Sequence, residues 1–217
     1  MNLCLIVQSC DKYSWLWEGW YLSFKKHWTL NVPVYFVTEE MDFPYQNMAI
    51  CNIKTGTKSW SDQLIYALNQ VPFDNIIYSM EDMYFTGGMP DWVGLLYDFK
   101  EMEMDCLRMY PGVSNPCHPY IFEHEHTTYK HTYMKVAKGS IYSVSMSPAI
   151  WRKEFLLSCL QPGETGWEME NEGSDRLNQR NGWSVWNVKE MDMFAIDTVF
   201  KGIPNKNYTD MIRRLIK

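Results

Sequence analysis

The chain has 217 residues, which is enough for one sizeable hydrophobic core but short for two full domains. Its formal net charge is -6 at pH 7 and its basic residues are scattered, apart from Arg213 and Arg214, so nucleic acid is excluded as a principal partner. No apolar run approaches the ~20 residues that span a bilayer, and the N-terminus lacks the basic region of a signal peptide. We therefore expect a soluble, cytoplasmic protein without a membrane span.

The cysteine and aromatic contents add two expectations. The six cysteines form no Cys-x-x-Cys pair and no spacing typical of a zinc site or a disulfide framework, which predicts reduced, mostly buried thiols. Aromatic residues make up 16% of the chain, including ten tryptophans. Most should lie in the core, while some of the excess suits a surface on which sugar rings pack.

The first third of the chain alternates strand and helix patterns. Four short apolar runs predict buried strands: 3–7, 33–38, 48–53 and 75–80. Apolar side chains at helical spacing predict two helices: 14–28, capped by Ser14, and 61–69. This order predicts a βαβαβαβ region of doubly wound type, with parallel strands and right-handed crossovers.

After a Gly/Pro break at 86–90 the pattern becomes mixed. The remaining helices are predicted at 92–104, 148–160 and 167–180. An antiparallel strand is predicted at 138–146 and a last strand at 184–189, with loops at 111–119 and at the polar, histidine-bearing 120–131. The chain should thus form one α/β domain.

The fourth predicted strand stops at two adjacent carboxylates, Glu81 and Asp82. Ligands of open α/β sheets bind just beyond the carboxyl ends of the strands, so these side chains should face a small molecule. Neighbouring buried acids repel and lose hydration unless a cation or a donor satisfies them, which favours a divalent metal. The alternative is that the two acids cap the following turn or pair with surface lysines.

Two further clusters compete for chemistry. In the first, Glu123–His126, the alternation would place both histidines on one face of an extended segment as a metal pair, but no third ligand follows, so we favour a solvated loop. In the second, Trp167–Glu170, a carboxylate beside an indole would have a raised pKa suited to general-base work. The acids of that second cluster would equally complement a helix N-terminus.

Several catalytic patterns are missing from the sequence. There is no Gly-x-Gly-x-x-Gly after the first strand, no P-loop, no Gly-x-Ser-x-Gly and no His-Glu-x-x-His. Dinucleotide oxidoreductases, kinases, α/β-hydrolases and metalloproteases are therefore disfavoured.

Two segments resemble small GT-A glycosyltransferases from viruses and bacteria, and they occur in the same order along the chain. Residues 76–85 resemble the acidic motif of that family, and residues 145–170 resemble its acceptor and base segment. A similar domain stands at the front of a chlorella-virus multidomain glycosyltransferase. The resemblance therefore implies a viral domain that works in the host cytoplasm, with further domains in a longer natural chain. One departure is clear, because Ser79–Asp82 lacks two aspartates separated by one residue.

The resemblance implies a GT-A-like, Rossmann-type mixed sheet flanked by helices, with a nucleotide-binding half at 1–90 and an acceptor-binding half at 91–217. It implies a nucleotide-sugar donor, with UDP-sugar favoured, a glycan acceptor, and Mn²⁺ or Mg²⁺ against the diphosphate. The residues that it implicates are Asp82 and Glu81 for metal, Gln8, Ser9, Asp11 and Glu81 for the nucleotide, and Glu170 or, second, Glu168 as the base of an inverting transfer.

Two other classes stay open from sequence. One is a carbohydrate-binding protein without enzymatic activity, in which the aromatic residues hold sugar and the acids are structural. The other is a metal-dependent nucleotidyltransferase, which would share the metal site but would have no use for the segment Trp167–Glu170.

Overall fold

A nine-stranded mixed sheet forms the centre of the computed structural model, which describes residues 2–85, 87, 90–109, 121–189, 194–195, 198–200, 203–204 and 210. The predicted loop at 111–119 falls outside these ranges. The order of the strands in the sheet is β3-β2-β1-β4-β9-β6-β10-β8-β7. Their bounds are β1 Leu3–Gln8, β2 Val34–Thr38, β3 Ile50–Lys54, β4 Asn75–Met80, β6 Cys106–Arg108, β7 Phe122–Thr127, β8 Thr132–Val136, β9 Ala149–Arg152 and β10 Val185–Val188.

Helices and small strands complete the described part of the chain. The helices are the 3-10 helix η1 (Asp11–Leu16) and α1 (Trp17–His27), α2 (Trp60–Gln70), α3 (Trp92–Glu101), α4 (Lys153–Cys159) and α5 (Gly166–Asn178). Two short antiparallel pairs are β5 (Tyr84–Phe85) with β11 (Phe194–Ala195), and β12 (Val199–Phe200) with β13 (Ile203–Pro204). The predicted strand at 184–189 therefore exists as β10 but is not the last one.

The first four strands pair in parallel, as the sequence predicts. β1 lies between β2 and β4, with Leu5 opposite both Val34 and Ile77. β9 then enters antiparallel to β4 and to β6, so the sheet changes from a parallel to a mixed half at this strand.

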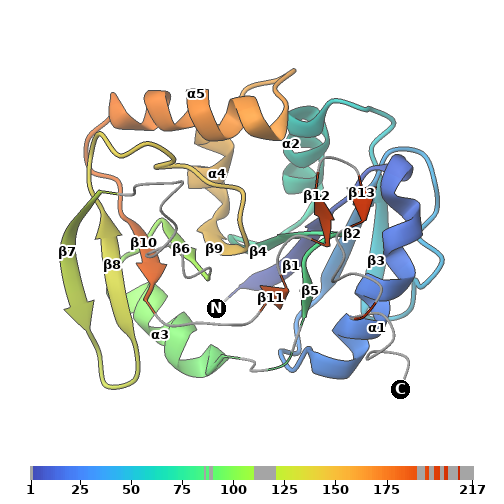
Figure 1. The fold of residues 1–217 in the computed structure, drawn as a ribbon, viewed down its shortest axis with the longest axis horizontal. Helices are drawn as coiled ribbons and strands as arrows, with labels where there is room; N and C mark the ends of the chain where they lie inside the picture. The colour runs from blue at the N-terminus through green and yellow to red at the C-terminus, as the bar shows by residue number, and fades with distance from the viewer. Residues whose placement is uncertain are drawn as a thin grey trace.

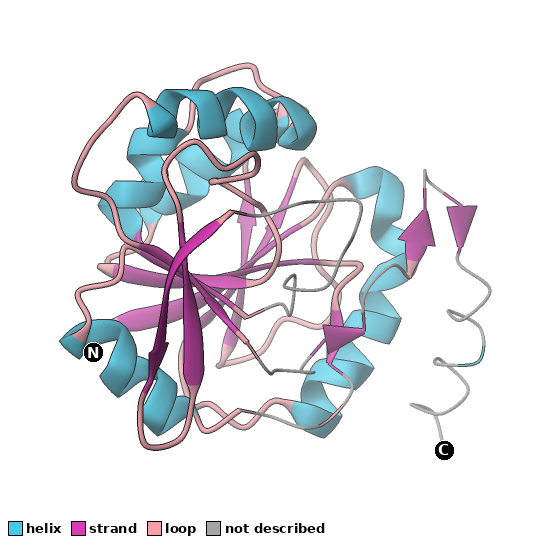
Figure 2. Cartoon of the chain, turned by 60° about the vertical axis from the view of Figure 1, so that its left-hand side comes forward, coloured by secondary structure: helices cyan, strands magenta, loops and turns pink. Residues whose placement is uncertain are grey.

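Helices cover both faces of the sheet, α1 and α3 on one and α2, α4 and α5 on the other (Figures 1 and 2). The alternation of β1 explains this arrangement, because successive side chains of a strand point to opposite faces. Leu5 and Val7 pack with the residues of α1 and α3, whereas Cys4 and Ile6 pack with those of α2, α4 and α5.

Aromatic side chains fill much of the core, which confirms the expectation for most of the tryptophans that the structure describes. Trp17, Trp20 and Trp151 are fully buried. Trp20 contacts Phe36 and Phe43 edge to face, in the geometry that aromatic rings prefer. A conspicuous exception is the exposed Trp167.

The predicted alternation of strands and helices is incomplete. No helix lies between β2 and β3 in the fully described segment 39–49. Side chains hold that segment in place of helical hydrogen bonds: the backbone N–H of Phe43 donates to Oδ1 of Asn52, 2.8 Å away, and Phe43 itself is buried.

The first predicted helix starts differently from the expectation. The 3-10 turn η1 precedes α1, and the side chain of Ser14 caps neither helix. The indole nitrogen of Trp17 donates to Oγ of Ser9 at 2.7 Å, which holds the start of α1 against the end of β1. Tertiary contact therefore decides where this helix begins.

The predicted strand at 138–146 is wrong, and β8 lies earlier in the chain. The backbone of 138–146 forms turns whose polar groups bond to α5 instead of to a neighbouring strand: the N–H of Val144 donates to Oγ of Ser174 at 2.9 Å, and that of Gly139 to Oδ1 of Asn178 at 2.9 Å. Serine and asparagine side chains offer the backbone such alternatives to a ladder.

The predicted helix at 148–160 and the predicted loop at 120–131 are also corrected. The first begins as the central strand β9 and becomes helical only at Lys153, because β4 and β6 supply ladder partners on both sides. The second contains the edge strand β7, whose exposed, charged side chains conceal a strand that is held by pairing with β8.

Candidate functional site

A cavity of about 660 Å³ lies just beyond the carboxyl ends of β1 and β4. Its lining comes from the chain that follows β1, β2, β3 and β4: Gln8, Ser9, Cys10, Asp11, Lys12, Tyr13, Glu39, Glu40, Lys58, Trp60, Gln63, Met80, Glu81 and Asp82. From β1 the chain continues to β2 on one side, and after β3 it returns to β4 on the other. Connections that diverge in this way open the crevice in which ligands of α/β sheets bind.

The structure brings together the sequence-predicted residues Gln8, Ser9, Asp11, Glu81 and Asp82, all of which line this cavity. The predicted residues Glu168 and Glu170 do not line it and lie on α5. The nucleotide and metal candidates thus form one site, and the base candidates form a second group.

Gln8 joins the floor of the cavity to the neighbouring elements. Its Oε1 accepts from the hydroxyl of Tyr78 at 3.0 Å, and its Nε2 donates to the carbonyl of Trp60 at 2.7 Å. Its backbone carbonyl accepts from the N–H of Glu81 at 3.3 Å. Both ends of the amide are engaged with protein atoms, so Gln8 positions α2 and the acidic turn relative to one another.

Asp11 holds the turn that follows β2. Its carboxylate accepts from the backbone N–H groups of Glu39, Glu40 and Met41 at 3.0 to 3.1 Å. In return, the N–H of Asp11 donates to Oε2 of Glu39 at 3.2 Å. These charge-assisted bonds fix one wall of the cavity.

Glu81 is only 6% exposed, although it carries a carboxyl group. Burial raises its pKa well above the ordinary value, and the charge of Asp82 raises it further, while hydrogen bonds from Cys10 and Ser9 act in the opposite direction. The backbone carbonyl of Asp82 accepts from the hydroxyl of Thr198 at 2.6 Å. A cation at this turn would stabilise the charged form of Glu81.

The reactivity of the Cys10 thiol, which lines this cavity, can be measured directly. Burial raises its pKa to about 11, and the charge of Glu81 adds to the effect. Thiolate is the reactive form, so we expect Cys10 to react with iodoacetamide more slowly than the exposed Cys51 near neutral pH, with a rate that rises about tenfold per pH unit until about 11. Residue-resolved mass spectrometry measures both rates. Equal labelling of Cys10 and Cys51 near neutral pH would contradict the shift.

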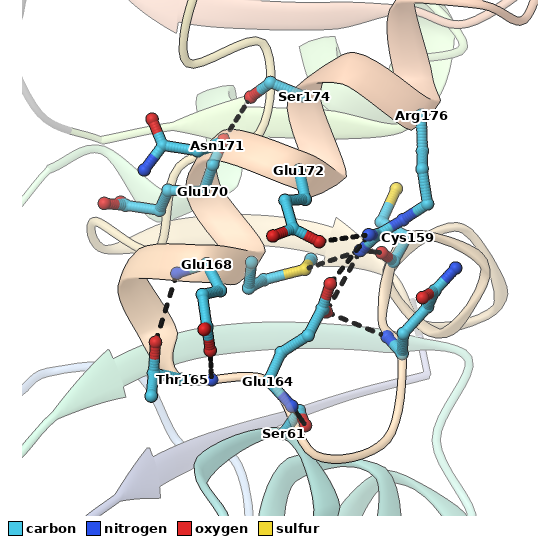
Figure 3. A network of polar contacts seen from close by, with 12 residues as sticks. Ser61, Cys159, Glu164, Thr165, Glu168, Glu170, Asn171, Glu172, Ser174 and Arg176 are labelled. Carbon is cyan, nitrogen blue, oxygen red and sulfur yellow. Dashed lines mark hydrogen bonds and ion pairs between the residues drawn. The ribbon is translucent and has the colours of Figure 1, made fainter.

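Glu168 caps its own helix. Thr165 accepts from the N–H of Glu168, and Oε2 of Glu168 accepts from the N–H of Thr165 at 2.8 Å, which completes a capping box (Figure 3). These bonds lower the pKa of Glu168, so the raised pKa expected for a carboxylate beside Trp167 is wrong at this position. Glu168 is exposed, and its side chain stabilises the N-terminus of α5.

The side chain of Glu170 points away from the side of α5 on which Glu164 and Arg176 lie (Figure 3). Its Oε1 accepts from the hydroxyl of Ser145 at 3.0 Å and from the backbone N–H of Met146 at 2.8 Å. Burial raises the pKa of Tyr78, and the charges of Glu81, Asp82 and Glu170 contribute in the same direction. Glu170 is therefore within electrostatic range of the residue that holds Gln8 at the cavity floor.

A buried ion pair fixes α5 relative to α2 and α4. Arg176 Nη1 lies 2.6 Å from Oε1 of Glu164, and its Nη2 donates to the carbonyl of Cys159 at 2.8 Å (Figure 3). The backbone N–H of Glu164 donates to Oγ of Ser61 at 2.9 Å. These bonds join three helices on one face of the sheet and hold the first turn of α5 beside the cavity.

Sequence reasoning missed Glu39, Glu40, Lys58, Trp60 and Gln63 as cavity residues. The rule that identified Glu81 also applies to the ends of β2 and β3, where Glu39, Glu40 and Lys58 stand. Trp60 and Gln63 lie in the first turn of α2, and only the packing of that helix brings them to the cavity.

We predict that the two histidines of β7 do not bind zinc. His124 and His126 are exposed with ring centroids 6.3 Å apart, and the described residues contain no group of three His, Cys, Asp or Glu that could hold a metal ion. We expect the double change to alanine to leave the melting temperature nearly unchanged, because an exposed pair contributes little to stability. Zinc bound at one ion per chain and lost together with the fold in this variant would contradict the prediction.

No protein-family model matches the chain, and no curated protein matches it by sequence. Solved structures do match by fold. S. aureus TarS 1-349 superposes with a TM-score of 0.62 at 14% identity, over 99% of this chain and 64% of that one. The same fragment in complex with UDP gives 0.60 at 16% identity over 100% and 64%, and its complex with UDP-GlcNAc gives 0.54 at 15% over 99% and 65%. This chain thus spans less than two thirds of the TarS fragment.

A second kind of neighbour is a CMP:2-keto-3-deoxy-manno-octonic acid synthetase complexed with CTP. It gives a TM-score of 0.51 at 12% identity, over 100% of this chain and 98% of that one. At such identities the likeness defines the fold alone. That fold is the predicted GT-A-like mixed sheet flanked by helices, shared by nucleotide-sugar glycosyltransferases and nucleotidyltransferases. None of the described helices has the length and apolar character of a membrane span.

Proposed function

We propose that the chain is a glycosyltransferase that moves a sugar from a nucleotide-diphosphate donor, with a UDP-sugar favoured, to a hydroxyl of a glycan acceptor. The observation that carries this proposal is the cavity at the ends of β1 and β4, with Glu81 and Asp82 at its edge, in a GT-A-like fold. Structures of this fold complexed with UDP and UDP-GlcNAc support the choice of donor.

The donor would occupy the cavity with its nucleotide toward Ser9 and Asp11 and its diphosphate toward Asp82. Asp11 holds the wall, Gln8 holds the floor, and the exposed Lys58 adds a cationic side chain to the lining. Residues 1–90 then form the nucleotide-binding half and 91–217 the acceptor-binding half.

The acidic turn fits Mg²⁺ or Mn²⁺. Such ions are bound by one or two carboxylates together with substrate phosphates and water, so a protein group of three ligands is not required. Asp82 would hold the ion with Glu81 beside it, since both acids line the cavity at the carboxyl end of β4. The bound ion would act as a Lewis acid that stabilises the leaving diphosphate.

Glu170 is the proposed general base of an inverting transfer. Ser145 and Met146 hold its Oε1, and Oε2 would accept the proton of the acceptor hydroxyl as the hydroxyl oxygen attacks the donor sugar and UDP leaves. Glu168 is the weaker candidate, because its carboxylate is engaged in the capping box.

A nucleotidyltransferase is the second candidate, because the synthetase complexed with CTP covers the whole chain at a TM-score of 0.51. That chemistry joins a sugar to a nucleotide and releases pyrophosphate, so it would bind a nucleoside triphosphate. A carbohydrate-binding protein without activity, the third class, would bind free sugar independently of nucleotide.

Thermal-shift measurements with UDP, UDP-sugars, CTP and free monosaccharides, each with Mn²⁺ and with EDTA, separate the three classes, because ligands that bind the native state raise its stability. The glycosyltransferase predicts the largest shift for UDP or a UDP-sugar with Mn²⁺, followed by slow release of UDP from the matching donor. A larger shift with CTP, or shifts with free sugars alone, would contradict it.

The setting of the enzyme is part of the proposal. Five described cysteines are free thiols, which together with a nucleotide-sugar donor favours the cytoplasm. TarS is longer than this chain, and we propose that further domains accompany the chain in its natural protein. A viral source rests on the sequence resemblance alone.

A further inference from the structure

We propose that Trp167 and Tyr142 form an aromatic platform that binds a neutral sugar ring of the acceptor, next to Glu170. The inference rests on the proposed glycosyltransferase function, and it assigns the acceptor a place and a chemical class. Four observations carry it.

The first observation is the exposure of Trp167. Its side chain is 65% exposed at the second position of α5, whereas Trp17, Trp20 and Trp151 are fully buried. The capping box at Thr165 and a bond from Nδ2 of Asn171 to the carbonyl of Trp167, 2.7 Å long, fix the backbone beneath it. An indole held out to solvent on a rigid helical turn offers apolar area at little cost in side-chain entropy.

The second observation is the strained backbone of Tyr142. Its φ is +53°, a left-handed conformation that non-glycine residues rarely adopt. The buried guanidinium of Arg108 holds it there, because Nη2 donates to the carbonyls of Tyr142, at 2.6 Å, and Ser143. The result is an edge-to-face contact with Trp167, with ring centroids 6.2 Å apart and planes at 69°. Strain that the surroundings enforce is typical of functional sites.

The third observation is a stripe on α5. Trp167, Glu170, Ser174 and Asn178 are three or four residues apart, so they share one helix face. All four contact the loop 137–148. Trp167 contacts Tyr142, and Glu170 accepts from Ser145 and Met146. Ser174 bonds to Val144, and Asn178 bonds to Ser140. Trp167 and Glu170 are thus neighbours on one face of α5. Further along that face, Ser174 and Asn178 hold the loop in place.

The fourth observation is the position of this end of the stripe beside the donor cavity. Gly166 precedes Trp167 and packs on the indole of Trp60, which lines the cavity; a Cβ at Gly166 would lie 3.2 Å from Cε2 of that ring. Glu170 also acts electrostatically on Tyr78, whose hydroxyl holds Gln8. A sugar on the platform would therefore lie beside the proposed base, at the end of α5 that adjoins the donor cavity.

The chemistry of the platform selects a neutral carbohydrate. The CH face of a pyranose packs on an indole, and a nearby carboxylate accepts hydrogen bonds from its hydroxyl groups. Glu170 stands beside Trp167 on this face and the exposed Glu168 follows Trp167 in the chain, so their negative charge would repel sugars that bear phosphate or carboxylate.

Saturation-transfer NMR tests the platform with methyl glycosides of glucose, galactose, mannose, xylose and N-acetylglucosamine, and with glucuronic acid as the anionic probe, in the presence of UDP and Mn²⁺. We expect at least one neutral glycoside to bind the wild type and the anionic probe to give no signal. Trp167→Ala should weaken that binding by about tenfold and Trp167→Phe by less, as expected for loss of an aromatic contact. The matched control is Tyr129→Ala, which removes another exposed ring, 99% accessible, from the β7–β8 turn and should change nothing.

Equal binding by wild type and Trp167→Ala, preferential binding of glucuronic acid, or loss of binding in Tyr129→Ala would overturn the platform. Failure of the proposed function looks different, because it is measured with UDP alone. If UDP binds and Trp167→Ala retains both its UDP affinity and its hydrolysis of the donor, but no neutral glycoside binds the wild type, only the platform is wrong. If glycosides bind through Trp167 but UDP does not bind, the platform belongs to a carbohydrate-binding protein and the enzyme assignment fails.

Discussion

Asp82→Asn is expected to abolish most of the gain in UDP affinity that Mn²⁺ gives the wild-type protein. Asp82 lies at the end of β4 on the edge of the cavity, and replacing a carboxylate by an amide removes the charge that a divalent cation requires. Calorimetric titration of UDP with Mn²⁺ and with EDTA measures the effect in both proteins. The fold should persist, because asparagine has nearly the same size and shape as aspartate and retains one side-chain carbonyl oxygen.

Two carboxylates serve as controls for this experiment. Glu81→Gln should be milder than Asp82→Asn, since Glu81 is proposed to lie beside the ion that Asp82 holds. Glu40→Gln removes an exposed charge from the same cavity lining and should leave the metal dependence unchanged. Equal UDP affinity with Mn²⁺ and EDTA in the wild type would disprove metal assistance.

Glu170→Gln is expected to lower kcat by about two orders of magnitude or more while KM for the donor changes little, as for loss of a general base. Glutamine retains an oxygen that can accept from Ser145 and Met146, so the loop stays in place while the proton acceptor is lost. Steady-state kinetics with the donor and acceptor identified by the earlier screens provide the measurement.

Glu168→Gln is the matched variant two residues away. Glutamine can replace glutamate in a capping box, so we expect near-normal kcat and only a small loss of stability. Should Glu168→Gln damage kcat instead, the role of base moves to that residue. Normal kcat in both variants would point to a retaining enzyme or to a different site.

Local pattern was sufficient for much of the parallel half. The apolar runs of β1, β2 and β4 are buried on both faces, and a strand covered on both faces has a continuous apolar signature. The carboxyl-end rule predicted a ligand site at Glu81 and Asp82, and the family resemblance implied Gln8, Ser9 and Asp11. All five residues line one cavity.

The mixed half was predicted less well, because its strands depend on partners that are distant in sequence. β9 is a strand because β4 and β6 lie on either side of it, and β7 is a strand only through its ladder with β8. Serine-rich 138–146 has the alternation of a strand, yet its backbone groups bond to the side chains of α5. Local propensity cannot register such competition.

By itself, the sequence determined the class of fold, the place of the acidic turn and the absence of the familiar motifs of other enzyme classes, since these follow from short-range periodicity and residue type. Only the tertiary structure decided how the two acids of α5 differ. Glu168 and Glu170 are chemically identical and two positions apart, but helical geometry turns one toward Thr165 in its own cap and the other toward Ser145 and Met146 on the loop 137–148. The same packing brings Trp60 to the cavity and Trp167 to Tyr142, because contacts between helices and loops depend on the arrangement of the whole sheet.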